Sequence, residues 1–118
     1  MGLILTIIAY FLLCIFIIPA ITIGTIVSLF NHTANKYFKD IALSLDQLGN
    51  VICQHLFNIC LIKKTGYKFG NPDETISSVL GKNYVNKTLT KVGYLLSLML
   101  HKVDKNHVIN SIDNTENE

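Results

Sequence analysis

Polar residues that could form a site gather in two segments of an otherwise apolar chain. The first segment holds Asp46 and Gln47 with Asn50 one helical turn later, and the second runs from Asn71 to Ser78. Carboxylates beside hydroxyls can move protons, and the same groups can recognise a partner through hydrogen bonds. The candidate interaction residues are Asp46, Gln47, Asn50, Asn71, Pro72, Asp73, Glu74, Thr75, Ser77 and Ser78.

The competing interpretation of these residues is structural. Asp73 and Glu74 would start a helix, and Asp46 and Asn50 would satisfy backbone donors of a loop. The chain has no nucleophile elbow around a Ser and no His at a recognisable spacing, which are the signals that acid–base or acyl-transfer chemistry would leave. We therefore predict no catalytic residues and a protein that is not an enzyme.

Metal and cofactor sites are not predicted either. Cys53, His55 and Cys60 share one segment but form no C-x-x-C or H-x-x-x-H pair, so the usual metal-ligand spacings are missing. Gly81-Lys82 is not followed by Ser or Thr and is not a phosphate-binding loop. An odd number of three cysteines gives no disulfide framework.

Charge is distributed very unevenly along the 118 residues. Half of the chain (50%) is apolar and only 15% is charged, and no Asp, Glu, Lys or Arg occurs before Lys36. The basic residues are ten Lys with no Arg, so the bidentate fork that suits phosphates and base edges is absent and nucleic acid is not an expected partner. The charge-free N-terminal third predicts a segment in lipid, with the bilayer as a partner.

Leu3 to Phe30 is long enough to cross a membrane. A helix over these residues would be about 42 Å long, whereas the hydrocarbon core is about 30 Å thick. A cleaved signal peptide is disfavoured because the segment lacks a basic start. Pro19 predicts a kink or a break, which leaves two alternatives: a bent single span, or a re-entrant pair of short helices. Lys36 and Lys39 follow the span directly and predict a cytoplasmic C-terminal part at a bacterial inner membrane.

The rest of the chain predicts further helices. Apolar residues at spacings of three and four indicate a long amphipathic helix from Lys36 to Lys64. A polar stripe, Asp46, Asn50, Gln54 and Asn58, follows one side of it. Because Asp46 and its polar neighbours disfavour insertion, an interfacial helix is the better assignment than a second span.

Asn71-Pro72-Asp73-Glu74 has the order of a helix start, with Asn71 as N-cap and Glu74 reaching back. This predicts a short helix from Pro72 to Leu80 that ends at Gly81. A last helix is expected from Thr88 to Lys102, with its apolar face on the long helix. A brief helical turn should follow Asp104, and the chain should end in a frayed acidic tail over residues 113–118.

Asp46-Gln47 with Asn50, followed by Gly70-Asn71-Pro72-Asp73-Glu74-Thr75-Ile76-Ser77-Ser78 and Gly81-Lys82, resembles a group of small uncharacterised bacterial and phage or prophage membrane-associated proteins. In that group a DQ-x-x-N helix precedes a G-x-PDETISS-x-x-G-(R/K) segment. Members often have an Arg after the two serines, where this chain has Val79. If that Arg pairs with the DQ carboxylate, the pairing is absent here or falls to Lys82. The resemblance implies a membrane-associated class and no established activity.

Together these features predict an all-α protein in three parts. Residues 1–35 form the membrane segment, residues 36–112 a helical cytoplasmic or interfacial module, and residues 113–118 a disordered tail. The expected function is non-enzymatic: a membrane-anchored interaction or oligomerisation module with a protein partner or a second copy. The alternative is a phage-type membrane effector, holin-like or an exclusion factor, that oligomerises in the bilayer.

Overall fold

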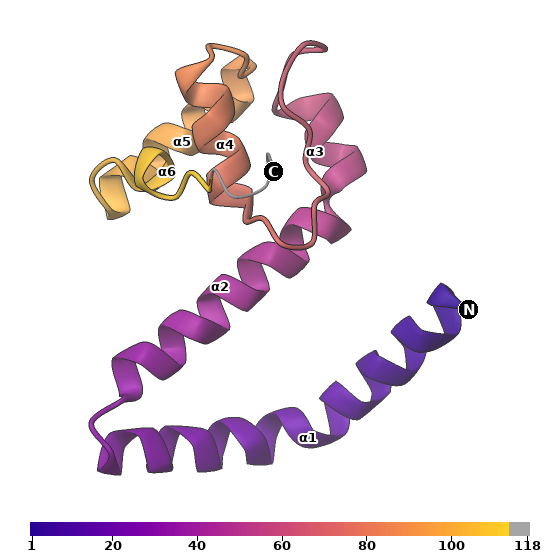
Figure 1. The fold of residues 1–118 in the computed structure, drawn as a ribbon, viewed down its shortest axis with the longest axis vertical. Helices are drawn as coiled ribbons and strands as arrows, with labels where there is room; N and C mark the ends of the chain where they lie inside the picture. Colours follow the sequence, from indigo (N-terminus) through magenta and orange to yellow (C-terminus); the bar gives the residue numbers. More distant parts are fainter. Residues whose placement is uncertain (114–118) are drawn as a thin grey trace. The chain divides into compact units, whose positions relative to one another are not determined.

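The computed structural model describes residues 1–113 as six helices with no strand among them, so the all-α prediction is confirmed (Figure 1). The only β-type pairing in this described part is an isolated bridge between Ile62 and Leu89. Two compact units divide the chain, one over Met1–Ile41 and one over Ala42–Glu118. We refer to them as unit 1 and unit 2. The predicted tail at 113–118 lies almost wholly outside the described residues.

Unit 1 contains α1, Gly2–Phe30, and the start of α2, Ala34–Ile52. Helix α1 is the one helix of the described chain long and apolar enough to cross a membrane. Pro19 lies inside it without ending it, and the helix bends midway along its length (Figure 1). The bent single helix is therefore confirmed, because a re-entrant pair would need a break that α1 does not have.

The predicted helix over Lys36–Lys64 is wrong as one continuous element, because it divides into α2 and α3, Gln54–Cys60. The two meet at Cys53, whose φ and ψ are −90° and 1°. The side chain of Gln54 donates to the carbonyl of Val51 at 2.9 Å. A side-chain amide that takes a backbone acceptor in this way competes with the helical bonds of the next turn.

Helix α4 covers Ile76–Val85, so the prediction of a helix over Pro72–Leu80 is wrong at both ends. Gly81 is not a helix stop, since it lies within α4 against the backbone of Val108. A Cβ at position 81 would collide with the Val108 carbonyl. The glycine is required there because it permits α6, His107–Asn110, to approach α4 closely.

Helix α5 covers Lys91–Val103 and begins at the N-cap Thr90, whose hydroxyl accepts from the Gly93 amide. It packs on α4 and α6 rather than laying its apolar face on a long helix as predicted. The brief turn expected after Asp104 is confirmed as α6.

The core of unit 2 is small and lies between the α3–α4 loop, α4 and α6. Its buried apolar residues are Leu61, Ile62, Phe69, Val79, Leu80, Leu89 and Val108. None of them lies on α2 or α3, whose predicted apolar face instead stays exposed at Leu45, Leu48, Ile52, Leu56 and Ile59. What holds α2 and α3 to the rest of unit 2 is therefore mainly a set of polar contacts, together with Phe57 of α3, which packs against the core with its ring centre 5.3 Å from that of Phe69.

Candidate functional site: a polar cluster between α2 and α4

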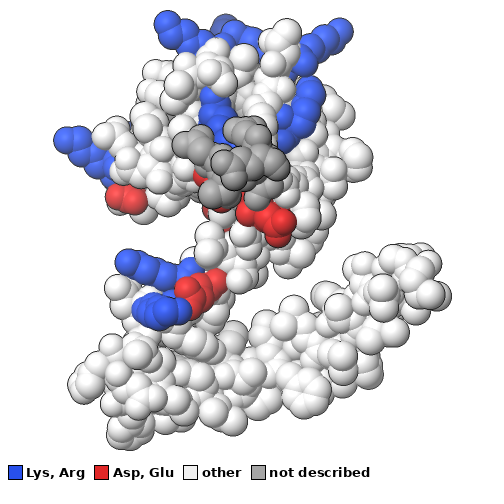
Figure 2. Space-filling model, viewed as in Figure 1, with Lys and Arg blue, Asp and Glu red and all other residues white. Residues whose placement is uncertain are grey.

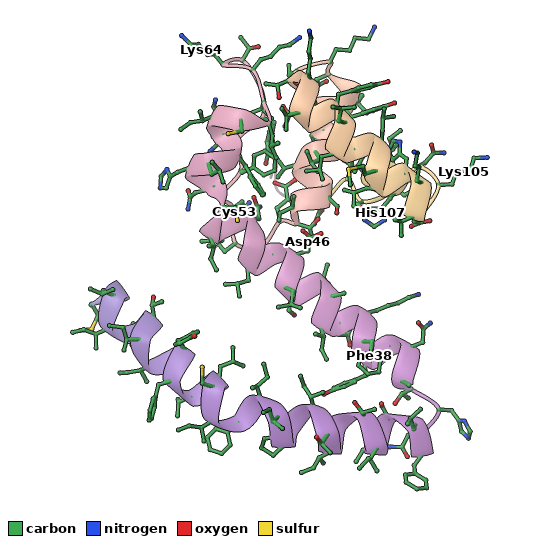
Figure 3. The ribbon with its side chains drawn as sticks, turned by 180° about the vertical axis from the view of Figure 1, so that it is seen from behind. Phe38, Asp46, Cys53, Lys64, Lys105 and His107 are labelled. Carbon is green, nitrogen blue, oxygen red and sulfur yellow. The ribbon has the colours of Figure 1, made fainter. Side chains whose placement is uncertain are left out.

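The structure brings the two predicted polar segments together where α2 faces the start of α4. Asp46, labelled in Figure 3, reaches the first turn of α4 from the side. Its Oδ1 accepts the Ile76 amide at 2.9 Å, and its Oδ2 accepts the Ser77 hydroxyl at 3.0 Å. A carboxylate is favoured at this position because it faces the positive end of the helix and satisfies an amide that has no partner within it.

Asn50 is fully buried and fastens the loop that precedes α4. Its Nδ2 donates to the carbonyls of Asn71 at 3.0 Å and Glu74 at 2.7 Å, and its Oδ1 accepts the Gly70 amide at 3.0 Å. Gln47 adds a fourth bond, from its Nε2 to the Asp73 carbonyl at 3.1 Å. These bonds supply the loop backbone with the partners that a helix or sheet would otherwise provide.

Asn58 and Asn83 perform the same task, although the sequence did not single them out as site residues. The Asn58 side chain accepts the Phe69 amide at 2.8 Å and donates to the Phe69 carbonyl at 3.2 Å. The buried Asn83 side chain pairs in the same way with the amide and the carbonyl of Tyr67, both at 2.8 Å. For Asn58, the signal was available in its four-residue spacing from Asn50 and Gln54. For Asn83, no sequence pattern pointed to a role.

Glu74 does not reach back to a helix start as predicted but is the centre of a buried ion pair. Its side chain has no exposed surface, and its Oε1 lies 2.6 Å from Lys82 Nζ. The Tyr67 hydroxyl donates to Oε2 at 2.9 Å, and the Ser78 hydroxyl donates to Oε1 at 2.7 Å. Lys82 also lies 4.4 Å from the centre of the Tyr67 ring. Lys82 therefore pairs with Glu74 and not with Asp46, the carboxylate that the family resemblance suggested.

This network shifts two pKa values in the same direction. Burial raises the pKa of Tyr67 above its ordinary 10.0, and the hydrogen bond to Glu74 raises it further. Burial by itself lowers the pKa of Lys82, but the hydrogen bond and negative charge of Glu74 outweigh it and raise the pKa above the ordinary 10.5. The charged lysine and the neutral phenol are thus the forms that the fold stabilises.

The predicted N-cap at Asn71 is wrong, because Thr75 caps α4. The Thr75 hydroxyl accepts the Ser78 amide at 3.0 Å from an extended backbone conformation. Asn71 starts a turn instead: its Oδ1 accepts the Asp73 amide at 3.0 Å, and its carbonyl accepts the Glu74 amide at 3.2 Å. An Asn side chain that accepts the amide two residues later is the usual form of such a turn.

Ser77, His107 and Asp104 form a second chain of hydrogen bonds, which joins α6 to α4. The Ser77 hydroxyl lies 3.2 Å from His107 Nε2, and His107 Nδ1 lies 3.1 Å from Asp104 Oδ2. The order Ser, His, Asp is that of a hydrolytic triad. The arrangement differs from a triad at Asp46, whose Oδ2 accepts the Ser77 hydroxyl and whose Oδ1 accepts the Ile76 amide.

Two of the ten candidate residues, Pro72 and Asp73, present exposed surface at the loop, while the other candidate side chains are at least partly enclosed by the contacts described above. Within residues 1–113 no group of three or more His, Cys, Asp or Glu side chains could hold a metal ion. Comparison of the chain with protein-family models, with curated proteins and with solved structures found no match. The cluster is thus arranged to join α2, the α3–α4 loop, α4 and α6.

Proposed function

We propose that the chain is a non-enzymatic, membrane-anchored module for interaction or oligomerisation. The observation that carries this proposal is α1, a charge-free helix of 29 residues whose most apolar stretch has no residue buried within the protein. Exposed apolar surface of this extent is stable in a bilayer and not in water. Lys36 and Lys39 next to α1 favour a cytoplasmic unit 2 at a bacterial inner membrane.

The polar cluster supports a scaffold rather than a catalyst. Its hydroxyls and carboxylates bond to one another and to backbone groups, so that Asp46 and Ser77 complete the start of α4. The outer surface of unit 2 then remains for a partner. Besides the exposed face of α2 and α3, this surface has an apolar stripe on α5, formed by Val92, Leu95, Met99 and Val103, which are 58% to 88% exposed.

The α5 stripe has the spacing that a partner helix requires. Val92, Leu95, Met99 and Val103 follow one another at three and four residues, which places them on one side of the helix. An equal stripe on another copy of the chain would cover it, as in an isologous helix pair. We therefore propose a homo-oligomer of unit 2, with anchoring by α1 raising the local concentration.

Two measurements test the membrane anchor and its orientation. A reporter that is active only in the periplasm should be silent when fused after Glu118, and a cytoplasmic reporter should be active at the same position. The opposite pattern would overturn the orientation. Deletion of residues 1–30 should release the chain from membranes on alkaline extraction, and retention would mean that a second segment inserts.

Cross-linking in membranes tests the oligomer. The wild type should give a cross-linked dimer or larger species, and Leu95→Asn with Met99→Asn should abolish it. Leu45→Asn with Leu48→Asn, on the exposed face of α2, is the matched control and should leave it intact. Equal loss in both variants would refute the α5 interface. Release of a dye trapped in vesicles by the wild type would favour the bilayer-perturbing effector instead.

A further inference from the structure

Five lysines lie at one end of unit 2, next to the C-terminal end of α3. Lys63, Lys64 and Lys68 come from the loop after α3, and Lys87 and Lys91 from the connection between α4 and α5. All five are exposed. Figure 2 shows Lys side chains gathered at the top of the view.

The fold brings these lysines together by pinning the two loops side by side. The Lys63 amide donates to the Thr88 carbonyl at 2.8 Å, and Lys63 Nζ donates to the Lys87 carbonyl at 3.1 Å. The Thr90 amide donates in turn to the Leu61 carbonyl at 2.9 Å. The positive charge is therefore a built property of this end of unit 2 and not the sum of independent flexible tails.

The chain segments that carry these lysines, both within the described residues, contain no acidic residue. The sequence has no Asp or Glu between Asp46 and Asp73 or between Glu74 and Asp104, and the first turn of α5 contains none. Lys91 even occupies the first position of α5, where a positive charge opposes the helix dipole. Charge of one sign, held against its own repulsion, indicates a negatively charged partner.

A hollow of about 470 Å³ opens beside two of these lysines, Lys87 and Lys91. Its lining combines positive charge with apolar and aromatic surface: Tyr84, Lys87, Leu89, Thr90, Lys91 and Tyr94. The rings of Tyr84 and Tyr94 are parallel, with centres 5.8 Å apart. This volume is within the range of small-molecule sites, and its lining suits a ligand with an anionic end and an apolar body.

We propose that this hollow binds an anionic phospholipid, with the phosphate between Lys87 and Lys91 and the first part of an acyl chain against Tyr94 and Leu89. A lipid is favoured over a nucleic acid because the cationic residues are all Lys and the hollow is largely apolar. The proposed lipid site rests on the proposed function, because α1 would hold unit 2 beside a bilayer whose cytoplasmic leaflet carries negative charge.

The test uses the full chain in neutral maltoside micelles, where binding is measured whether or not α1 spans a membrane in the cell. Dihexanoyl phosphatidylglycerol should shift the amide resonances of Lys87 to Tyr94. Dihexanoyl phosphatidylcholine, which has no net charge, should bind more weakly by a factor of roughly ten or more. Failure here with a correct reporter topology would refute the lipid site alone. Failure of the topology test would refute the cytoplasmic orientation, and retention of the chain after deletion of residues 1–30 would refute α1 as the sole anchor.

Two double variants show where the lipid binds. Lys87→Gln with Lys91→Gln should weaken phosphatidylglycerol binding roughly tenfold or more. Lys102→Gln with Lys105→Gln, which removes the same charge from the other end of α5, should leave binding unchanged. Unshifted amides of Gly70 and Ile76 in both variants would show that the polar cluster is intact. An equal effect of the two variants would overturn the site.

Three further outcomes decide the class of ligand. Tyr94→Ala should weaken the binding of phosphatidylglycerol and should not create binding of inorganic phosphate. If inorganic phosphate binds as tightly as the lipid, the acyl contact is wrong and the lipid proposal fails. If a thymidine oligonucleotide displaces phosphatidylglycerol at equal or lower concentration, the surface is a nucleic-acid site and the proposal also fails.

Discussion

Helix α1 and unit 2 use polar side chains in opposite ways. In α1 the Thr6 and Thr22 hydroxyls each donate to the carbonyl four residues earlier, at 2.9 and 2.8 Å. In unit 2 the bonds of Asn50 and Asp46 span 20 to 31 residues. A polar group in α1 is thus satisfied by its own helix, whereas in unit 2 polar groups make the tertiary structure.

The difference follows from what each region must bury. An anchor in lipid needs only internal backbone bonds and an apolar exterior. Unit 2 has a core of seven buried apolar residues, which is small, and a loop without regular structure between α3 and α4. Buried amides and one ion pair replace the missing apolar contacts, so unit 2 should be much more sensitive than α1 to isosteric polar changes.

The largest expected effect comes from the buried ion pair. Lys82→Met leaves the Glu74 carboxylate buried without a counter-charge, which typically costs about 3–5 kcal/mol. Urea unfolding of the full chain in micelles, followed by amide exchange of unit 2, measures it. Adding Glu74→Gln should recover part of the loss. Lys102→Met, at an exposed position of α5, is the control, and an equal loss there would show that the pair does not stabilise unit 2.

Raising the pH should also lower the stability of unit 2, by less than Lys82→Met does. The pKa values of Tyr67 and Lys82 are raised above 10.0 and 10.5, so their contribution is fully present below those values and is lost as the pH rises through the folded-state pKa values. When Lys82 loses its proton, the Glu74 carboxylate has no counter-charge, but the Lys82 side chain still fills its place in the fold. The melting temperature of unit 2 should be level near neutral pH and fall above pH 10, and the fall should be weaker in Glu74→Gln.

Next in size is the effect of Asn50→Asp. The substitution keeps the shape but turns an acceptor oxygen toward the carbonyls of Asn71 and Glu74, at an expected cost of about 2–3 kcal/mol. Exchange of the Gly70 amide should increase with it. At Gln54, one turn later on the same stripe, the side chain donates to the nearby Val51 carbonyl at the junction of α2 and α3, and Gln54→Glu should cost much less. Equal costs would mean that the loop is not held by Asn50.

The smallest expected effect comes from replacing a Thr by Ala, once in unit 2 and once in α1. Thr75→Ala removes the cap of α4 and should cost about 1 kcal/mol, with Thr75→Ser restoring most of it. Thr22→Ala removes only a bond to the carbonyl of Ile18 and should leave the helix content of α1 in micelles unchanged. A larger effect of Asn71→Ala than of Thr75→Ala would support the cap that the sequence indicated.

The candidate site could be predicted in its membership but not in its contacts. The residue types around Asp46 and Asn71 showed that polar groups had to be satisfied there, and the structure brings the two segments together. The cap was placed at Asn71 because Pro72 and the acids match a helix start. In the structure Thr75 is the N-cap, and Asp46 from α2 accepts the amide of Ile76, the first residue of α4. A contact from another helix leaves no local pattern in the sequence.

The sequence by itself determined the helical class and the candidate membrane span, because both depend on local periodicity and on a long absence of charge. Tertiary structure alone decided the division at Cys53, the burial of Glu74 with Lys82, and the meeting of five lysines at one end of unit 2. These features join residues that are far apart in the chain or depend on side-chain geometry. They are settled only when buried polar groups compete for a limited number of partners.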